Sequence, residues 1–147
     1  MKVISLWQPW AQLWVLGEKV FETRHWYTKY RGPLLVHAAK TKRGMGSISG
    51  ICSEDHIEKA LARHGFNEDN LPLGAIIGKV DLIGCCSTND VQPVNANETH
   101  FGDWGPGRFC WEAANPQCFA VPVPCKGQRG FWNVEWPAGE AQKGETP

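Results

Sequence analysis

The sequence predicts one α+β domain, a small closed or half-open β-barrel of about six short strands with two helices inserted early in the chain. Length is the first observation behind this prediction: 147 residues, 42% of them hydrophobic, fill one core but not two ordinary domains. The second is a series of short, β-branched apolar segments separated by Gly and Pro. The third is a pair of segments with helical spacing, both in the first half of the chain.

The chain begins with a strand, a short helix and another strand. Residues 3–6 suit a short strand, and Pro9 suits the first position of a helix, WAQLWVL, which Gly17 ends. A turn signal, Arg-Gly-Pro, then introduces the apolar strand at residues 34–39.

Between them, residues 19–26 alternate in the manner of an extended segment. One face carries Val20, Glu22, Arg24 and Trp26, and the other carries Lys19, Phe21, Thr23 and His25. Two ionic side chains and an indole therefore share a face.

A second helix and a long strand follow. Ser53 suits the N-cap of a helix over residues 54–64, which has acidic residues in its first turn and Gly65 at its end. Residues 74–86 are rich in β-branched side chains and predict a strand, in which Gly78 indicates a bulge or a tight bend.

The last part of the chain supplies short strands and a tail. Strands are predicted at residues 108–112, 118–123 and 131–135. Residues 137–147 lack core-forming side chains apart from one Thr, so we expect the folded domain to span residues 1–136 and the tail to be disordered.

Composition excludes several classes of protein. Fifteen basic and fifteen acidic side chains give a formal net charge of zero, which disfavours non-specific coating of duplex nucleic acid and confines any basic site to a local region. No apolar run reaches the roughly 20 residues of a membrane helix, and the first residues lack the features of a signal peptide. The six cysteines form no CxxC pair, so we expect reduced thiols, a cytoplasmic location, and no metal ion or cofactor.

The densest polar cluster follows the first helix. Lys19 and Arg24 flank the carboxylate of Glu22. Cations held in this way remain available to an anionic group such as phosphate. In a dry site Lys19 would instead act as a base or nucleophile. A third interpretation is that Glu22 and Arg24 form a ladder of solvated surface pairs that contributes little to stability.

Eight tryptophans exceed what a core of this size usually needs. Trp7 and Trp26 lie at the ends of elements, where a ring borders a cleft, whereas Trp10 and Trp14 have the i, i+4 spacing of core residues on a helix. Flat indoles beside cations suit the stacking of a nucleobase, and ordinary core packing is the competing interpretation.

Two glycine-rich loops add candidate ligand contacts. Residues 101–108, FGDWGPGR, carry Trp104 and Arg108 and are expected to lie over a pocket, without the spacing of a P-loop. Residues 126–130, KGQRG, form a second small basic turn or a solvated hairpin. His37, in an apolar strand, is interpreted as a hydrogen-bonded interior histidine.

Several blocks, in this order, resemble the ASCH domain, the activating-signal-cointegrator homology domain of the PUA-like superfamily. They are SLWQPWA (5–11), the GxKxxExR pattern (17–24), YRGPLLVHAAK (30–40) and LPLGAIIGKVDL (71–82). FGDWGPGRFCW (101–111) and GQRGFWNV (127–134) resemble the later strands of small bacterial and phage members. The similarity covers residues 1–136.

This resemblance implies a PUA-like small β-barrel with short peripheral helices and a cleft between the first helix and the barrel. It implies that the cleft holds Lys19, Glu22 and Arg24, with Gln8, Pro9 and Trp10 at the neighbouring helix start. PUA-like relatives mostly bind RNA, often a modified or flipped base, so the resemblance implies RNA binding here.

Some ASCH-type proteins are enzymes, among them an amidohydrolase of acetylcytidine and proteins credited with ribonuclease activity. The amidohydrolase pattern has Thr three residues after the signature Lys, where this sequence has Glu22. Thr23 is adjacent, but strand alternation points it to the opposite face. The sequence therefore lacks one residue of the amidohydrolase pattern, which argues against assigning acetylcytidine as the substrate.

Three hypotheses for function follow. The first is a module that binds single-stranded RNA or a nucleotide-like ligand, with Lys19 and Arg24 on phosphate or a base edge, Glu22 on a donor edge, and a ring of Trp7, Trp26 or Trp104 stacked on the base. The alternative is a metal-independent hydrolase of RNA or a modified nucleoside, with Lys19 as base or electrostatic stabiliser and Glu22 as proton carrier. The third is an interaction module whose Trp-rich cleft receives a protein partner.

Overall fold

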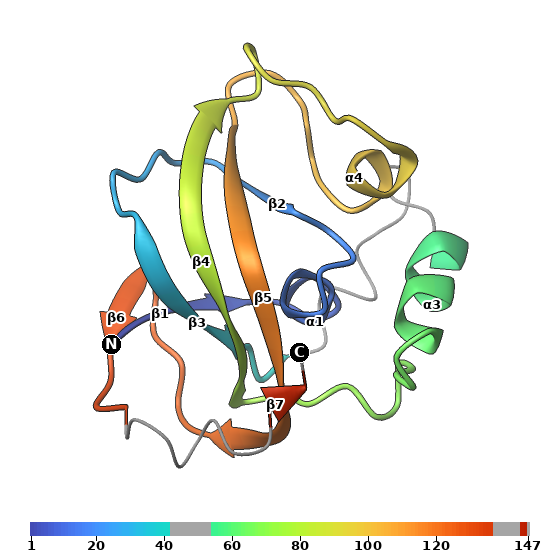
Figure 1. Cartoon of the computed structure of the whole chain (residues 1–147), viewed down its shortest axis with the longest axis vertical. Coiled ribbons are helices and arrows are strands. Elements are labelled where there is room, and N and C mark those ends of the chain that lie inside the picture. The colour runs from blue at the N-terminus through green and yellow to red at the C-terminus, as the bar shows by residue number, and fades with distance from the viewer. Residues whose placement is uncertain (42–53, 137–144, 147) are drawn as a thin grey trace.

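In a computed structural model the chain folds around one curled, mixed β-sheet with short helices beside it (Figure 1). The structure describes residues 1–41, 54–136 and 145–146. The strands are β1 (Lys2–Leu6), β2 (Phe21–Arg24), β3 (Gly32–Ala38), β4 (Ala75–Ser87), β5 (Phe109–Pro124), β6 (Phe131–Asn133) and β7 (Glu145–Thr146). The helices are α1 (Trp10–Val15), α3 (Glu54–Ala62) and α4 (Ala96–His100).

The strand order is β2-β5-β4-β3-β1-β6, and β7 pairs with β5. The pair β1–β3 is parallel and the other pairs are antiparallel. Aromatic side chains bring the two ends of this order together: Trp26, just after β2, lies edge-on against Trp111 of β5 at 4.7 Å and Phe131 of β6 at 5.3 Å between ring centroids. Among the described strands β2 and β6 share no ladder, so the sheet is the half-open form of the predicted barrel.

Helix α1 is buried on nearly every side, as its mostly apolar residues favour, and the buried residues include Gln12. It packs against β3, β4 and β5, α3 packs against α1, and α4 packs against α3 (Figure 1). Trp14 is fully buried, which confirms its predicted place in the core.

Strand β4 confirms the prediction for residues 74–86, including the irregularity at Gly78. The β4–β5 register shifts between Ile76 and Gly78. A Cβ at Gly78 would lie 2.2 Å from the carbonyl oxygen of Gln117 and 2.7 Å from Cβ of Val15. Glycine is therefore required where α1 and β5 approach this strand most closely.

One prediction about the later elements is wrong, and one element was missed. The strands expected at 108–112 and 118–123 are one strand, β5, because Asn115 takes a left-handed backbone conformation (φ 51°) and the ladder to β4 continues past it. Asn tolerates this conformation better than most residues. Helix α4 was not predicted at all.

Two further predictions fall at least partly on residues that the structure does not describe. The N-cap assigned to Ser53 lies outside the described residues, as do residues 137–144 and 147 of the tail. The described part of the tail forms β7, which pairs with Cys118 and Phe119 of β5. The domain boundary at residue 136 stays a prediction.

Candidate functional site

The turn between α1 and β2 directs Lys19 into the protein. Gly17 ends the helix at φ 76°, and the backbone amides of Glu18 and Lys19 both donate to the carbonyl of Leu13, at 3.0 and 3.3 Å. Lys19 thus lies before the strand. Strand alternation does not apply to it, and its predicted place on the face opposite Glu22 is wrong.

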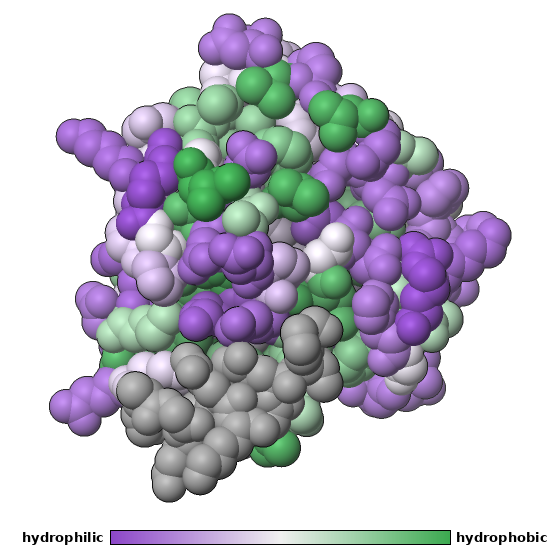
Figure 2. All heavy atoms as spheres, in the orientation of Figure 1, coloured by the Kyte–Doolittle hydropathy of each residue, from purple (hydrophilic) through white to green (hydrophobic). Residues whose placement is uncertain are grey.

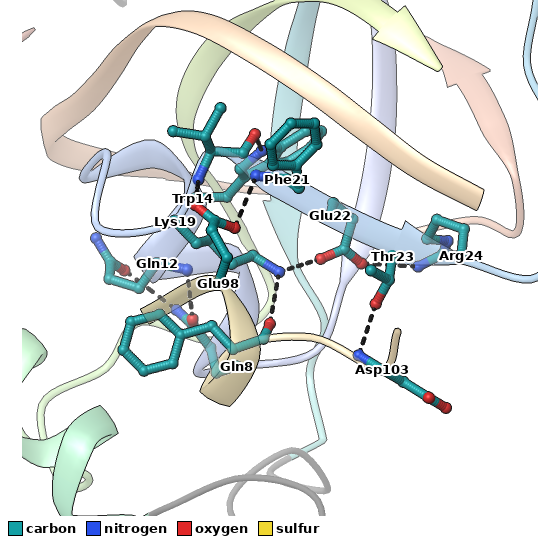
Figure 3. A network of polar contacts seen from close by, with 12 residues as sticks. Gln8, Gln12, Trp14, Lys19, Phe21, Glu22, Thr23, Arg24, Glu98 and Asp103 are labelled. Carbon is teal, nitrogen blue, oxygen red and sulfur yellow. Dashed lines mark hydrogen bonds and ion pairs between the residues drawn. The ribbon is translucent and has the colours of Figure 1, made fainter. Parts of the chain in front are cut away.

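Lys19 and Glu22 form a buried ion pair (Figure 3). The side chains are 1% and 8% exposed. The Lys19 ammonium donates to one carboxylate oxygen of Glu22 and to the carbonyl of Phe101, at 3.4 Å, and lies 5.6 Å from the centroid of the Trp10 ring. Because Glu22 is buried, the interpretation of Glu22 and Arg24 as solvated surface pairs fails for the Glu22 carboxylate.

The second carboxylate oxygen of Glu22 lies 3.5 Å from the guanidinium of Arg24, so one buried carboxylate serves two cations. The Arg24 side chain is 23% exposed, and its guanidinium carbon lies 5.9 Å from the Trp111 ring centroid. The Nε atom of Arg24 is buried and has no hydrogen-bond partner among the described residues. Arg24 therefore retains donor capacity at the edge of the ion cluster.

The loop after α4 is fixed over β2 by polar contacts. The amide of Asp103 donates to Oγ1 of Thr23 at 2.9 Å (Figure 3). Arg108 donates to the carbonyls of Asp103, at 3.0 Å, and Thr23, at 3.3 Å. Trp104 donates to the carbonyl of Glu98 at 2.7 Å. These contacts hold residues 101–108 as one wall of a cleft, as the sequence suggested.

Sequence reasoning missed the buried carboxylate of Glu98. It accepts the backbone amides of Val20, at 2.7 Å, and Phe21, at 3.3 Å, and so fixes the start of β2. A signal was present: Asn95 caps α4 by accepting the amide of Glu98, and Asn followed three residues later by Glu is a recognisable N-terminal pattern.

These elements enclose a cleft of about 900 Å³. Of the predicted site residues, those that line it are Trp7, Trp10, Lys19, Glu22, Arg24, Trp26 and Arg108. Ser5, Thr23, His25, Asp103, Gln128 and Arg129 also line it. The basic turn at 126–130 thus contributes to the cleft. Thr23 also lines it, although alternation placed this residue on the far face.

Three predicted site residues lie elsewhere among the described residues. Gln8 is buried and donates to Gln12, at 3.1 Å, and to the carbonyl of Pro72, at 3.0 Å. Pro9 is buried at the start of α1. Trp104 packs edge-on against Phe21, with 5.5 Å between ring centroids. All three support the cleft without lining it.

The cleft is locally positive in a chain of zero net charge. Its lining includes four cationic side chains, Lys19, Arg24, Arg108 and Arg129, and two carboxylates, Glu22 and Asp103. Within the described parts of the chain, no three His, Cys, Asp or Glu side chains gather as a metal site requires, and no helix there is long and apolar enough to cross a membrane.

A family model for the ASCH domain matches residues 4–123. Activating signal cointegrator 1 of Mus musculus and of Homo sapiens are each 30% identical to this chain over 132 residues, which is 90% of the chain and 22% of the relative. The chain therefore spans between a fifth and a quarter of the length of these curated relatives.

Solved structures show the same fold. A crystal structure of ASCH from Zymomonas mobilis has a TM-score of 0.56 and 14% identity, covering 97% of this chain and 90% of that one. A mutant of the same protein has a TM-score of 0.51 and 13% identity, over 97% and 93%. The predicted PUA-like architecture is confirmed, with the sheet curled but not closed.

Proposed function

The chain belongs to the ASCH domain family, whose PUA-like fold is associated with RNA binding, and on this basis we propose that its cleft binds single-stranded RNA or a nucleotide-like ligand. The observation that carries the proposal is Arg24, a partly exposed guanidinium at the edge of a buried ion cluster, whose Nε has no hydrogen-bond partner among the described residues. A base edge or a phosphate in the cleft supplies acceptors for the exposed part of this guanidinium.

The aromatic walls supply the second half of the recognition. Trp7 is 44% exposed and is the most accessible of the three indoles that line the cleft. One face of Trp10 receives the Lys19 ammonium, and Trp26 is held edge-on by Trp111 and Phe131. Because Trp7 is the most exposed of these rings, it is the ring we assign to stacking on a base, which is worth about 1–3 kcal/mol per base.

Lys19 and Glu22 have a positioning role in this proposal. The Lys19 ammonium is buried against Glu22, Phe101 and Trp10, so it acts on the ligand through the orientation of Glu22 and Arg24. Arg108 and Arg129 line the same cleft and suit contacts to the sugar-phosphate backbone.

Fluorescence titration with single-stranded RNA, single-stranded DNA, duplex RNA and free nucleosides tests the proposal. We expect saturable quenching by single-stranded RNA, with a shallow salt dependence because few phosphates are contacted. Arg24→Gln should weaken binding about 10- to 100-fold, since hydrogen bonds to a charged group are lost. Arg63→Gln is the matched control, because Arg63 lies just after α3 and does not line the cleft.

Two results would overturn the proposal: no saturable response to any nucleic acid or nucleoside, or equal affinities of Arg24→Gln and Arg63→Gln. Assaying the same mixtures for cleavage or deacylation products tests the alternative hydrolase. Lys19-dependent product formation would replace binding with catalysis as the function. A candidate protein that displaces RNA from the cleft would support the interaction module instead.

A further inference from the structure

A second cavity of about 790 Å³ adjoins the cleft. The two share Ser5, Ala39, Gln128 and Arg129 in their linings, so the turn at residues 126–130 separates them as a common wall. A ligand that leaves the cleft around this turn enters the second cavity.

The turn is seated on the sheet by a chain of hydrogen bonds. His37 Nε2 lies 2.8 Å from the carbonyl of Cys125, and because a carbonyl only accepts, Nε2 carries the ring proton. His37 Nδ1 is then an acceptor, and the Ser5 hydroxyl donates a hydrogen bond to it at 3.1 Å. Ser5 in turn accepts from the Trp132 indole at 3.2 Å. His37 is thus the bonded interior histidine that the sequence predicted.

Gly127 lies directly on this chain of contacts. A Cβ at this position would be 2.7 Å from Cε1 of His37 and 2.9 Å from Oγ of Ser5. Real Cβ atoms essentially never approach other atoms so closely. Only glycine permits the turn to approach His37 and Ser5 this closely. The close packing and the hydrogen bonds fix the position of the turn before any ligand binds.

The second cavity carries positive charge and unused donors. Lys40, Lys126 and Arg129 line it, and no carboxylate is among the described residues that do. The backbone amides of Gly127, Gln128 and Arg129 make no hydrogen bond to any described residue. Cations from two separate segments, beside amides that have no partner among the described residues, are groups that can bind a phosphate.

We propose that the second cavity is a subsite for the phosphodiester that links the nucleotide in the cleft to its neighbour. This inference rests on the proposed function, because the cleft must first hold the base. The subsite would make a dinucleotide the smallest ligand that uses the whole site, and it adds affinity without adding base specificity.

Four probes test the subsite: a nucleoside, its 5′-monophosphate, a dinucleoside monophosphate, and the same dinucleoside with an uncharged methylphosphonate linkage. We expect the dinucleoside monophosphate to bind about tenfold or more tightly than the nucleoside, since hydrogen bonds to a charged group are gained. The methylphosphonate and the 5′-monophosphate should lose most of that gain.

The Lys40→Gln/Lys126→Gln variant removes cations that line only the second cavity. It should abolish the dinucleotide advantage and leave nucleoside affinity unchanged, whereas Lys59→Gln, at an exposed side chain of α3, should change neither. An advantage that survives in the double variant would overturn the subsite. So would an equal gain from the 5′-monophosphate, which would indicate a site for terminal phosphate. If the nucleoside binds and the linkage adds nothing, only this inference fails; if no probe binds, the proposed function fails with it.

Discussion

Neutralising Glu22 tests whether buried charge stabilises the floor of the cleft, which is the ion cluster of Lys19, Glu22 and Arg24. Glu22→Gln preserves the shape of the side chain and removes the charge that balances Lys19, whose side chain is only 1% exposed. Removing one partner of a buried ion pair costs about 3–5 kcal/mol, because the remaining charge stays away from water. Arg24 is partly exposed and can regain hydration, so most of the penalty comes from Lys19. We therefore expect the free energy of unfolding to fall by about 3–5 kcal/mol.

A double-mutant cycle separates this penalty from lost packing. Lys19→Met leaves Glu22 beside Arg24, which still provides a positive partner at 3.5 Å, so its cost should be smaller than that of Glu22→Gln. Combining Lys19→Met with Glu22→Gln removes both buried charges. The double variant should be more stable than the sum of the single losses predicts, by a coupling energy of about 1–3 kcal/mol.

Urea unfolding followed by tryptophan fluorescence measures these differences, because Trp14 and Trp111 are fully buried and report on the core. Unchanged m-values are needed to read the shifts in midpoint as changes in stability. If Glu22→Gln costs less than about 1 kcal/mol, the pair is worth no more than a solvated surface pair and the burial argument is refuted.

Three further predictions concern His37, Gly78 and the thiols. Burial lowers the pKa of His37, against the opposing effect of its hydrogen bond to Cys125. Below about pH 6.5 His37 is therefore protonated in the unfolded chain but remains neutral in the folded protein. As the pH falls through this range, the free energy of unfolding should fall by up to about 1.4 kcal/mol per pH unit. The same slope in a His37→Gln variant would contradict this. Gly78→Ala should destabilise the fold by about 1–3 kcal/mol or more, whereas Gly84→Ala, whose Cβ would meet a flexible Glu112 oxygen at 3.3 Å, should cost far less in the same urea assay. Among the described cysteines, exposed Cys86 should react first with iodoacetamide by mass spectrometry, because burial raises the pKa of Cys85, Cys110, Cys118 and Cys125; early labelling of Cys118 would refute this.

The elements that sequence predicted correctly are those whose signals are local. The strand with Gly78 and the helix ended by Gly17 depend on residues within one or two turns of the chain. The prediction divided strand β5 in two, and the interval between the two predicted strands contains Asn115-Pro116, a pair that normally marks a turn. In the structure the β4–β5 ladder continues past these residues because its register shifts at several points along β4. These shifts depend on the partner strand, which the sequence around residues 115–116 does not reveal.

The candidate site was predicted in its residues but not in its geometry. The sequence left open whether Lys19, Glu22 and Arg24 were a solvated ladder or a site, because the choice depends on burial. That burial comes from distant chain: Phe101 accepts from Lys19 across 82 positions, and Glu98 fixes the start of β2 from the unpredicted α4. Neither contact is visible in the spacing of residues 17–24.

Burial is graded across the cleft, and the gradient bears on how a ligand would be selected. The ion cluster at the floor is fixed before binding, whereas Trp7 and Arg129 at the rim are exposed. In the described part of the face drawn in Figure 2, apolar side chains form several small patches among polar ones. A partner protein held mainly by apolar burial would need a larger continuous patch than this face offers. A small ligand needs only a rigid donor and a ring to stack on. Its binding costs ordering entropy only at the rim, that is, at Trp7 and Arg129. Substitutions in the ion cluster of Lys19, Glu22 and Arg24 should therefore alter which ligand binds, while substitutions at the rim should alter mainly the affinity.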